Sequence, residues 1–261
     1  NAIKFQVFTA DKIIQKKFKG WKILKKLEFN TSWLKYLKKY SNKKKLLFGI
    51  SVFDVELVKK LKKQDVDFIK IASTEIQDLD LIENAAKKKV PIILSTGAST
   101  LVDISNAYEC VKKFNKNFAF LHCVSIYPAK PSQLNLNMIN SMRKFLGVPI
   151  GYSDHSSSIN IPSIAVSKGA CIIEKHITFN KKAKGPDHKF SLNENELIQM
   201  VRIIRETEAS FGKKIKEPAI KNERKNLARR LVTKLSLRHG ERIKEKHIVI
   251  LRADEKGILP A

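Results

Sequence analysis

Two histidines, His155 and His176, end the short segments Gly-Tyr-Ser-Asp-His and Glu-Lys-His. Because side chains alternate along a strand, Ser153 shares a face with His155, and Glu174 shares a face with His176. If the two segments are adjacent strands, about 4.8 Å apart, both imidazoles can reach one divalent cation and leave part of its coordination sphere open. Such an open site supplies Lewis-acid chemistry. The alternative is a pair of core or loop histidines satisfied by hydrogen bonds.

Lysine and hydroxyl side chains form a second set near the ends of apolar runs. Lys4 and Lys70 lie inside otherwise apolar segments, where an ammonium group is costly unless it is paired or meets an anion. Lysine gives a point charge and Ser or Thr gives a short donor, a combination that suits a phosphate and a carboxylate. An ordinary structural role is the alternative in so lysine-rich a chain. The members of this set are Lys4, Lys70, Ser73, Ser95, Thr96, Ser125 and Ser153.

Two further features bear on the same site. The Gly-Pro turn in the loop Gly185–Lys189 could aim the carboxylate of Asp187 into the mouth of a barrel. His122 has the strand parity opposite to that of Leu121, so we predict a buried structural histidine rather than a ligand.

Apolar runs that could position these residues alternate with amphipathic stretches, a pattern that predicts a parallel sheet with right-handed crossovers. The expected strands are Ala2–Val7, Leu46–Ile50, Asp67–Ile71, Pro91–Leu94, Phe118–Cys123, Pro149–Tyr152 and Ala170–Lys175. The expected helices are Asp54–Lys63, Asp78–Lys89, Leu101–Phe114, Asn135–Phe145, Ile159–Lys168 and Asn193–Phe211.

Polar groups stand at the carboxyl ends of most of these strands, which favours a (β/α)₈ TIM barrel over an open doubly wound sheet. No G-x-G-x-x-G turn follows a strand, which argues further against a dinucleotide-binding fold. Seven strands are expected where a barrel has eight, so we interpret the chain as a barrel lacking its first βα unit.

We divide the chain into three parts. Residues 1–212 form the barrel domain, incomplete at its N-terminus, and residues 213–226 form a charged linker. Residues 227–261 have a different character, with short apolar runs on either side of His239-Gly240-Glu241, and we expect a small, truncated β-rich module.

The chain has 261 residues, of which 51 are Lys or Arg and 25 are Asp or Glu, so its net charge is +26. A hydrophobic fraction of 43% predicts a folded chain. Only nine of the cations are Arg, whereas recognition of phosphates and bases in nucleic acids favours Arg. We therefore expect solvated basic helix faces that attract anionic substrates, and no nucleic-acid function.

Cysteine usage and hydropathy predict a cytoplasmic protein. Cys110, Cys123 and Cys171 are odd in number and widely spaced, which favours reduced thiols packed in the core. No apolar run is long enough for a membrane-spanning helix, and we expect no signal peptide and no membrane partner.

Ordered motifs along nearly the whole chain resemble those of the sialic acid synthase (N-acetylneuraminate synthase) family, in its sialic and legionaminic acid synthase branch. The Gly185–Lys189 loop is less similar to the pseudaminic acid branch. The motifs are Lys4–Gln6, Phe53-Asp54, Lys70–Glu75, Leu94–Gly97, Leu121–Pro128, Gly151–His155, Glu174–His176 and Gly185–Lys189.

This resemblance implies a metal-dependent transferase. Family members condense phosphoenolpyruvate with an N-acetylated hexose, such as N-acetylmannosamine or a diacetylated analogue, and release phosphate as they form a nonulosonic acid. They use Mn²⁺ or Mg²⁺. They form homodimers by exchanging a C-terminal antifreeze-like (SAF) domain, of which residues 227–261 would be the start.

The resemblance also assigns roles to residues. His155 and His176 match the metal ligands, and Glu75 or Glu174 could be the base that activates water. The positions that hold the phosphate of phosphoenolpyruvate are Lys4, Lys70, Ser95, Ser125 and Ser153, and those at its carboxylate are Ser51 and Ser73. The positions around the amino sugar are Gln6, Phe53, Glu75, Tyr127, Glu174, Asp187 and Arg252, the last reaching in from the partner subunit.

Three alternatives stay open. The chain could be another phosphoenolpyruvate-dependent aldolase or synthase, which a test of sugar acceptors would distinguish. It could be a catalytically incomplete fragment, because the barrel lacks one βα unit and its edges would be exposed. Nucleic-acid binding, the third, would show a steep loss of affinity with salt.

Overall fold

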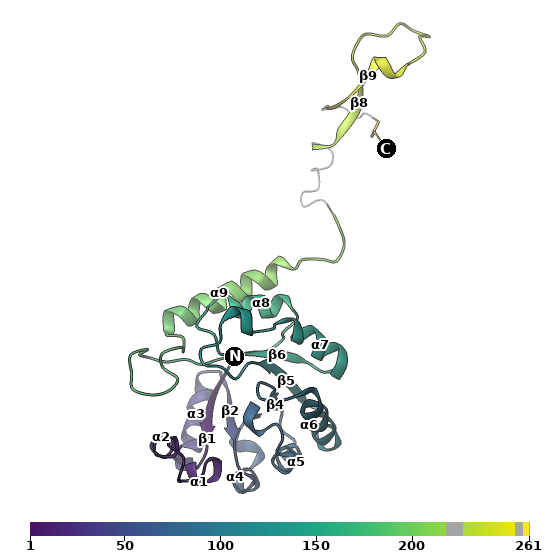
Figure 1. The fold of residues 1–261 in the computed structure, drawn as a ribbon. Coiled ribbons are helices and arrows are strands. Elements are labelled where there is room, and N and C mark those ends of the chain that lie inside the picture. The colour runs from purple at the N-terminus through teal and green to yellow at the C-terminus, as the bar shows by residue number, and fades with distance from the viewer. Residues whose placement is uncertain (218–226, 254–257, 261) are drawn as a thin grey trace. The chain divides into compact units, whose positions relative to one another are not determined.

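Seven parallel strands form one sheet in the computed structural model, and strands that follow one another in the chain are neighbours in the sheet (Figure 1). The structure describes residues 1–217, 227–253 and 258–260. The alternating α/β pattern and the parallel sheet predicted from the sequence are confirmed. The strands are β1 (Ala2–Val7), β2 (Leu47–Val52), β3 (Phe68–Ile71), β4 (Ile92–Ser95), β5 (Phe118–Cys123), β6 (Ile150–Asp154) and β7 (Ile173–Lys175).

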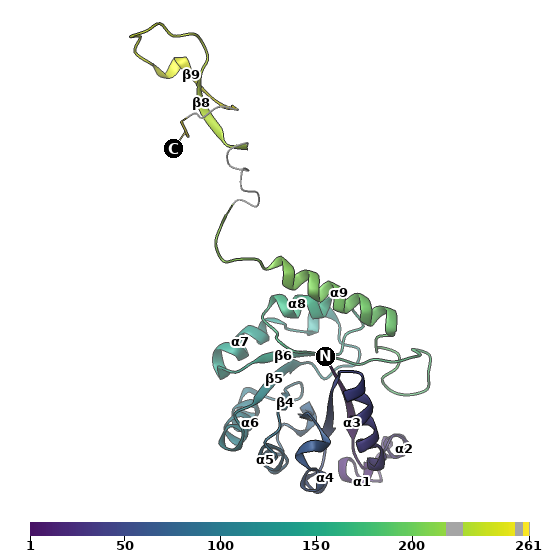
Figure 2. The ribbon, with the colours of Figure 1, turned by 180° about the vertical axis from the view of Figure 1, so that it is seen from behind.

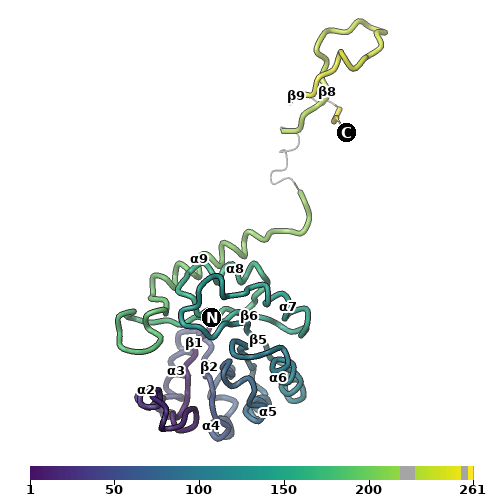
Figure 3. The backbone as a smooth tube through the Cα atoms, viewed as in Figure 1, coloured from purple at the N-terminus to yellow at the C-terminus, as the bar shows by residue number. Residues whose placement is uncertain are grey.

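The sheet is curled, so that its first and last strands face each other. Lys4 on β1 and Glu174 on β7 bring a side-chain nitrogen and oxygen within 3.8 Å. The backbone trace follows this curve strand by strand from β1 toward β6 (Figure 3). Within the described part of the chain, β1 pairs only with β2, and β7 pairs only with β6.

Helices lie around the outside of the curled sheet (Figures 1 and 2). Several begin at polar side chains that accept a hydrogen bond from the first turn: Asp54 from the Leu57 amide, Asp78 from the Leu81 amide, and Thr100 in a capping box with Asp103. The helices are α1 (Ala10–Ile13), α2 (Trp21–Lys26), α3 (Leu34–Lys43), α4 (Val55–Lys60), α5 (Leu79–Lys87), α6 (Leu101–Phe114), α7 (Asn137–Leu146), α8 (Ile161–Ser167) and α9 (Glu194–Ser210).

The hydrophobic core lies between the sheet and the surrounding helices, and the opposite face of β3, β5 and β6 is buried as well. Phe48, Ile50, Ile71, Leu94 and Phe120 are fully buried, and the inward faces of the helices pack onto the outer side of the sheet. Burial on both faces explains why the strands are continuous apolar runs rather than alternating ones.

The last expected strand was placed wrongly at its start, because β7 begins at Ile173 rather than at Ala170. The amide of Ala170 instead bonds the carbonyl oxygen of Ala165, at 3.0 Å, and so completes the C-terminal turn of α8. Gly169, with φ of +97°, makes that turn possible. Strand β6 is longer than expected at its end. It extends to Asp154, two residues beyond the expected end, so that Ser153 lies within the strand.

The segment between β1 and β2 holds three helices that the sequence pattern did not indicate. Helix α1 has four residues, and α2 has six and buries none of them. In α3 Leu34 and Ser41 are buried and Leu37 packs against the core, a helical spacing that we did not interpret as a helix in this lysine-rich segment.

The chain consists of two compact units, Asn1–Ser210 and Phe211–Ala261. In the second unit, β8 (Arg229–Thr233) and β9 (Ile248–Arg252) pair antiparallel, and the Glu241 amide bonds the Arg238 carbonyl in a turn between them. Of the expected linker, residues 218–226 lie outside the described residues, as do residues 254–257 and 261 of the expected module. No helix in the described ranges is long and apolar enough to cross a membrane.

Candidate functional site

Two lysines and two serines meet at the carboxyl ends of the first four strands. Lys4 Nζ donates to Ser51 Oγ at 3.0 Å, and Lys70 Nζ donates to Ser95 Oγ at 2.6 Å. Lys70 is almost fully buried, with 3% of its side chain exposed, and it also donates to the carbonyl oxygen of Ile71. We call Lys4, Ser51, Lys70 and Ser95 the lysine cradle.

The carboxylate of Glu174 faces both ammonium groups of the lysine cradle. Its oxygens lie 3.8 Å from Lys4 Nζ and 3.7 Å from Lys70 Nζ, and Oε1 accepts a hydrogen bond from Ser153 Oγ at 2.7 Å. Burial by itself would raise the pKa of Glu174, but the two lysines and Ser153 outweigh it and lower the pKa to about 2. Glu174 is therefore an anion at neutral pH, held between two cations.

Burial lowers the pKa of Lys70, and the neighbouring Glu174 carboxylate opposes that effect. A buried ammonium group with a single carboxylate partner, shared with Lys4, has unused capacity for a second anion. Two ammonium groups face one carboxylate, so the cradle keeps a net positive charge that can bind an anionic ligand.

Hydroxyl groups continue the cradle on its other side. Ser73 Oγ and Ser125 Oγ are 3.1 Å apart, and the buried Thr96 donates its hydroxyl to the Leu121 carbonyl. Gly97 gives these groups room, because a Cβ there would stand 2.5 Å from both Cys123 Sγ and Ser125 Oγ. Two hydroxyls with a close backbone approach are suited to the oxygens of a small anion.

The imidazoles of His155 and His176 are neighbours, with ring centroids 5.8 Å apart. Each follows a strand directly, His155 after β6 and His176 after β7. The ring of Tyr127 stacks on His155 at 4.1 Å and also meets His176, at 6.2 Å. The two rings thus share a partner on one side of the site.

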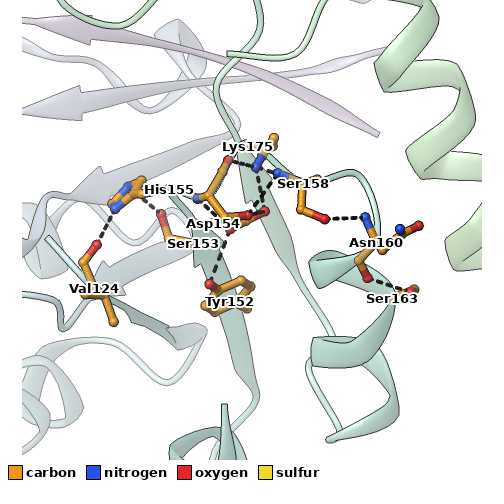
Figure 4. Close-up of polar contacts among 10 residues, drawn as sticks. Val124, Tyr152, Ser153, Asp154, His155, Ser158, Asn160, Ser163 and Lys175 are labelled. Atoms are coloured by element: carbon orange, nitrogen blue, oxygen red, sulfur yellow. Dashed lines mark hydrogen bonds and ion pairs between the residues drawn. The ribbon is translucent and has the colours of Figure 1, made fainter. Parts of the chain in front are cut away.

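Hydrogen bonds settle which nitrogen of His155 is free to bind a ligand. Nδ1 lies 2.7 Å from the carbonyl oxygen of Val124, which can only accept, so Nδ1 carries the proton (Figure 4). Nε2 faces the hydroxyls of Tyr127 at 3.2 Å and Ser153 at 3.5 Å. Burial lowers the pKa of His155 and of His176, which favours the neutral rings that bind metals.

Asp187 approaches the histidines from the loop after β7. Its Oδ2 lies 3.7 Å from Nδ1 of His176. Even so, the described residues contain no group of three or more His, Cys, Asp or Glu side chains that could hold a metal ion. A cation held by these two imidazoles would take its remaining ligands from water or substrate oxygens.

The other residues singled out from the sequence lie in different places. Glu75 is half-buried at the end of a short 3₁₀ turn, Gln6 is exposed on β1, and Phe53 packs edge-on against Phe8 at 5.8 Å. Arg252 ends β9 in the second unit and is exposed there.

Two structural predictions are confirmed. His122 is buried and its Nε2 bonds the Leu134 carbonyl at 2.8 Å, so it is a structural histidine. All three cysteines are free thiols. Cys123 is buried, whereas Cys171 is exposed, so the expectation of core packing was wrong for Cys171.

The sequence reading missed one pair of residues at this site. Lys175 Nζ lies 2.5 Å from Asp154 Oδ2, on the face of β6 and β7 opposite to Ser153 and Glu174 (Figure 4). Each of the two residues directly precedes a predicted histidine in the sequence, which was the available signal.

Comparison with known proteins identifies relatives that match nearly the whole chain. The chain is 32% identical to the N,N'-diacetyllegionaminic acid synthase of Legionella pneumophila over 283 residues, covering 100% of this chain and 79% of that protein. It is 33% identical to the N-acetylneuraminate-9-phosphate synthase of Homo sapiens over 237 residues, covering 90% of this chain and 66% of that protein.

A solved structure gives the same result in three dimensions. The N-acetylneuraminic acid (sialic acid) synthetase of Leptospira borgpetersenii, crystallised with citrate, superposes with a TM-score of 0.81 at 35% identity, covering 87% of this chain and 81% of that one. The NeuB family matches residues 1–216. Since that match takes in every strand of the curled sheet and both histidines, the chain belongs to the NeuB family.

Proposed function

We propose that the protein condenses phosphoenolpyruvate with an N-acetylated hexose to form a nonulosonic acid and phosphate. The observation that carries this proposal is the convergence of the lysine cradle with two neighbouring imidazoles at one end of a parallel sheet. Ammonium and hydroxyl groups of the cradle would bind the enol phosphate. The two imidazoles beside the cradle would act on the second substrate, the sugar. Membership of a family whose members are named as synthases of such acids supports the same function.

The cradle would seat phosphoenolpyruvate by both of its anionic groups. Its phosphate would lie against the lysines, with the carboxylate on other hydroxyls. Lys4 and Lys70 would stabilise the negative charge that builds up as phosphate departs. The proposed phosphate ligands are Lys4, Lys70, Ser95, Ser125 and Ser153, and the proposed carboxylate ligands are Ser51 and Ser73.

The reaction forms a C–C bond and a C–O bond and breaks one C–O bond, while the aldehyde oxygen gains a proton and the attacking water loses one. C3 of the enol phosphate bonds to the aldehyde carbon of the open-chain sugar, and water adds at C2. The C2–O bond to phosphate then breaks, which leaves the 2-keto acid. Cleavage of a C–O bond rather than a P–O bond requires that the whole phosphate be held while it leaves, which suits a cradle of lysines.

His155 and His176 fit a divalent cation. His155 donates its Nδ1 proton to a backbone carbonyl, the outer contact typical of a metal-bound histidine, and so turns Nε2 toward the site. We propose Mn²⁺ or Mg²⁺ as the ion; when bound, it would polarise the sugar aldehyde as a Lewis acid. Tyr127, whose ring contacts both imidazoles, would keep them in place.

The sugar would lie beside the histidines. Tyr127 and Asp187 are near them, and their hydroxyl and carboxylate groups suit the hydroxyls of a hexose. Glu174, which faces the lysines, would contact the sugar from the inner side. Gln6, Phe53, Glu75 and Arg252 complete the proposed sugar-binding set. The relatives' names differ in their acid, so we propose the acceptor at the level they share, an N-acetylated hexose.

Of the two carboxylates that could activate water, we propose Glu75. Glu174 is held by two ion pairs and a hydrogen bond, so its proton affinity is low. Burial raises the pKa of Glu75. Glu75 lies two residues after Ser73, whose hydroxyl faces that of Ser125, and its raised pKa means that it takes up a proton more readily than Glu174 does.

The experiment that tests the function measures phosphate release from phosphoenolpyruvate, with Mn²⁺, in the presence of N-acetylmannosamine or the diacetylated hexose. Phosphate released only with sugar and metal would support the proposal. A catalytically incomplete chain, our second candidate, would bind phosphoenolpyruvate without turnover, since β1 and β7 have no outer neighbours among the described residues. Failure to bind phosphoenolpyruvate at all would overturn the function itself.

We propose a (β/α)₈ barrel as the complete architecture, with one more βα unit between β1 and β7. The curl that brings Lys4 and Glu174 together supports it, because it leaves two free edges that face each other. A version of the protein carrying an added upstream βα unit should be more stable and should turn over if the present chain does not.

We further propose that β8 and β9 belong to a SAF domain exchanged in a homodimer, with Arg252 acting on the partner's site. Mixing a His155→Ala chain with an Arg252→Ala chain should then restore activity that neither has alone. Full activity of Arg252→Ala by itself would contradict this arrangement. The three free thiols also support a cytoplasmic location.

A further inference from the structure

Strands β6 and β7 carry two cross-strand pairs, back to back. Ser153 is in register with Glu174, and Asp154 is in register with Lys175. Because side chains alternate, the first pair faces the lysine cradle and the second lies on the opposite side of the strands. Figure 4 shows the second pair beside Ser158. His155 and His176 are the next residues after the second pair, one on each strand.

The Asp154–Lys175 pair is buried and its hydrogen-bonding groups are fully used. Asp154 accepts from Lys175 Nζ, the Tyr152 hydroxyl, and the amide and hydroxyl of Ser156. Lys175 also donates to the carbonyl oxygens of Ser156 and Ser158. Of the two side chains, 0% of Asp154 and 3% of Lys175 is exposed.

Such a pair is a weak source of stability. Moving two charges out of water costs several kcal/mol for each ion, and an apolar pair of similar size is often as stable or more so. What the pair does provide is geometry. It ties the ends of two adjacent strands together and, through Ser156 and Ser158, fixes the loop that follows His155.

We propose that Asp154 and Lys175 are positioning residues that set the separation and direction of the His155 and His176 imidazoles, and so the affinity of the site for a divalent cation. This inference rests on the proposed function, in which those imidazoles bind the metal. Neither residue touches the ion or the substrates. Their effect is transmitted through one peptide unit on each strand.

The test is the affinity of the full chain for Mn²⁺, measured by titration with electron paramagnetic resonance. The double variant Asp154→Leu/Lys175→Met replaces the ion pair by apolar side chains, and it should fold with reduced stability because Tyr152 and Ser156 lose hydrogen-bond partners. Its Mn²⁺ affinity should fall roughly 10- to 100-fold, the range typical of lost outer-shell contacts. Asp154→Asn, which keeps the size of the side chain, should give a smaller loss in the same direction.

Lys38→Met is the matched control, because Lys38 and Asp67 form an ion pair of the same 2.5 Å length elsewhere in the fold. It should leave Mn²⁺ affinity unchanged. If the double variant fails to fold, Asp154→Asn decides the question. The inference is overturned if a folded variant, either the double variant or Asp154→Asn, binds Mn²⁺ with an affinity within twofold of that of the unchanged chain. If the unchanged chain shows no Mn²⁺ site that His155→Ala removes, the proposed function fails instead.

Discussion

The ammonium nitrogen of Lys4, on the first strand of the sheet, lies 3.8 Å from the carboxylate of Glu174, on the seventh. Lys70 reaches the same carboxylate from β3, at 3.7 Å. One anion therefore balances two cations at the centre of the curve. An enol phosphate carries more negative charge than the Glu174 carboxylate. When it binds, Lys4 and Lys70 therefore interact more strongly with the phosphate than they do with Glu174 in the free protein.

Replacing Lys70 tests this relationship directly. Lys70→Met removes a buried charged donor, and a hydrogen bond to a charged group contributes about 1.5–3 kcal/mol, so phosphoenolpyruvate should bind roughly 10- to 100-fold more weakly. Calorimetric titration measures the loss. Lys88→Met is the control, since Lys88 bonds carbonyl oxygens of Lys59 and Leu61 outside the site. Equal affinity in the Lys70 and Lys88 variants would remove Lys70 from the phosphate site.

Gly97 offers a second test of the cradle, without any change of charge. In Gly97→Ala the new Cβ would stand 2.5 Å from Cys123 Sγ and Ser125 Oγ, so at least one of them must move. We expect KM for phosphoenolpyruvate to rise about tenfold, in proportion to the loss of one hydrogen bond. In Gly20→Ala the nearest atom, on Ile14, would be 3.5 Å away, and KM should not change. A normal KM in a folded Gly97 variant would place the substrate elsewhere.

The strands were predictable because their signal is local. Phe118–Cys123 and Ala2–Val7 are apolar runs bounded by polar clusters, and both strands have the predicted bounds. The polar residues that follow or end the strands were equally visible, since the carboxyl ends of parallel strands meet at one end of the sheet. That rule is enough to bring Lys70, Ser95 and His155 into one list of candidates.

The pairings within the site could not be predicted, because they depend on curvature and register. Nothing near Lys4 in the sequence indicates that β1 and β7 face each other, so its contact with Glu174 was not foreseen. The Asp154–Lys175 pair depends on the register of β6 with β7, which short apolar runs do not determine. Helices α1 and α2 were missed for a different reason, since they bury little apolar surface.

The pH dependence of turnover tests Glu75 as the base. Burial raises its pKa, while a 2.8 Å hydrogen bond from Thr74 opposes that effect and Asp78 adds to it. A base must be deprotonated, so the rate should fall as pH drops through this raised pKa. Thr74→Val should move that acid limb to higher pH, and Asp78→Asn should move it to lower pH.

Glu75→Gln should remove the limb and reduce kcat about 10²- to 10⁴-fold, the usual contribution of a general base. The pH profile of kcat for the four proteins gives the answer. If neither Thr74→Val nor Asp78→Asn moves the acid limb, or if Glu75→Gln keeps its activity, Glu75 is not the base. Glu174 would then be the remaining carboxylate of the two.

Metal dependence is the last prediction, and it concerns His155 and His176 together. Incubation with EDTA should abolish phosphate release, and added Mn²⁺ should restore it. Because the two imidazoles are the proposed protein ligands, His155→Ala or His176→Ala should weaken Mn²⁺ binding by more than about 100-fold, beyond the effect of an outer contact. His239→Ala is the control, since His239 is an exposed histidine in the second unit. Its Mn²⁺ affinity should equal that of the unchanged chain. Turnover that survives both EDTA and the loss of His155 would mean that the sugar aldehyde is activated by side chains alone, and the stacked Tyr127 hydroxyl, 3.2 Å from Nε2, would be the donor to examine next.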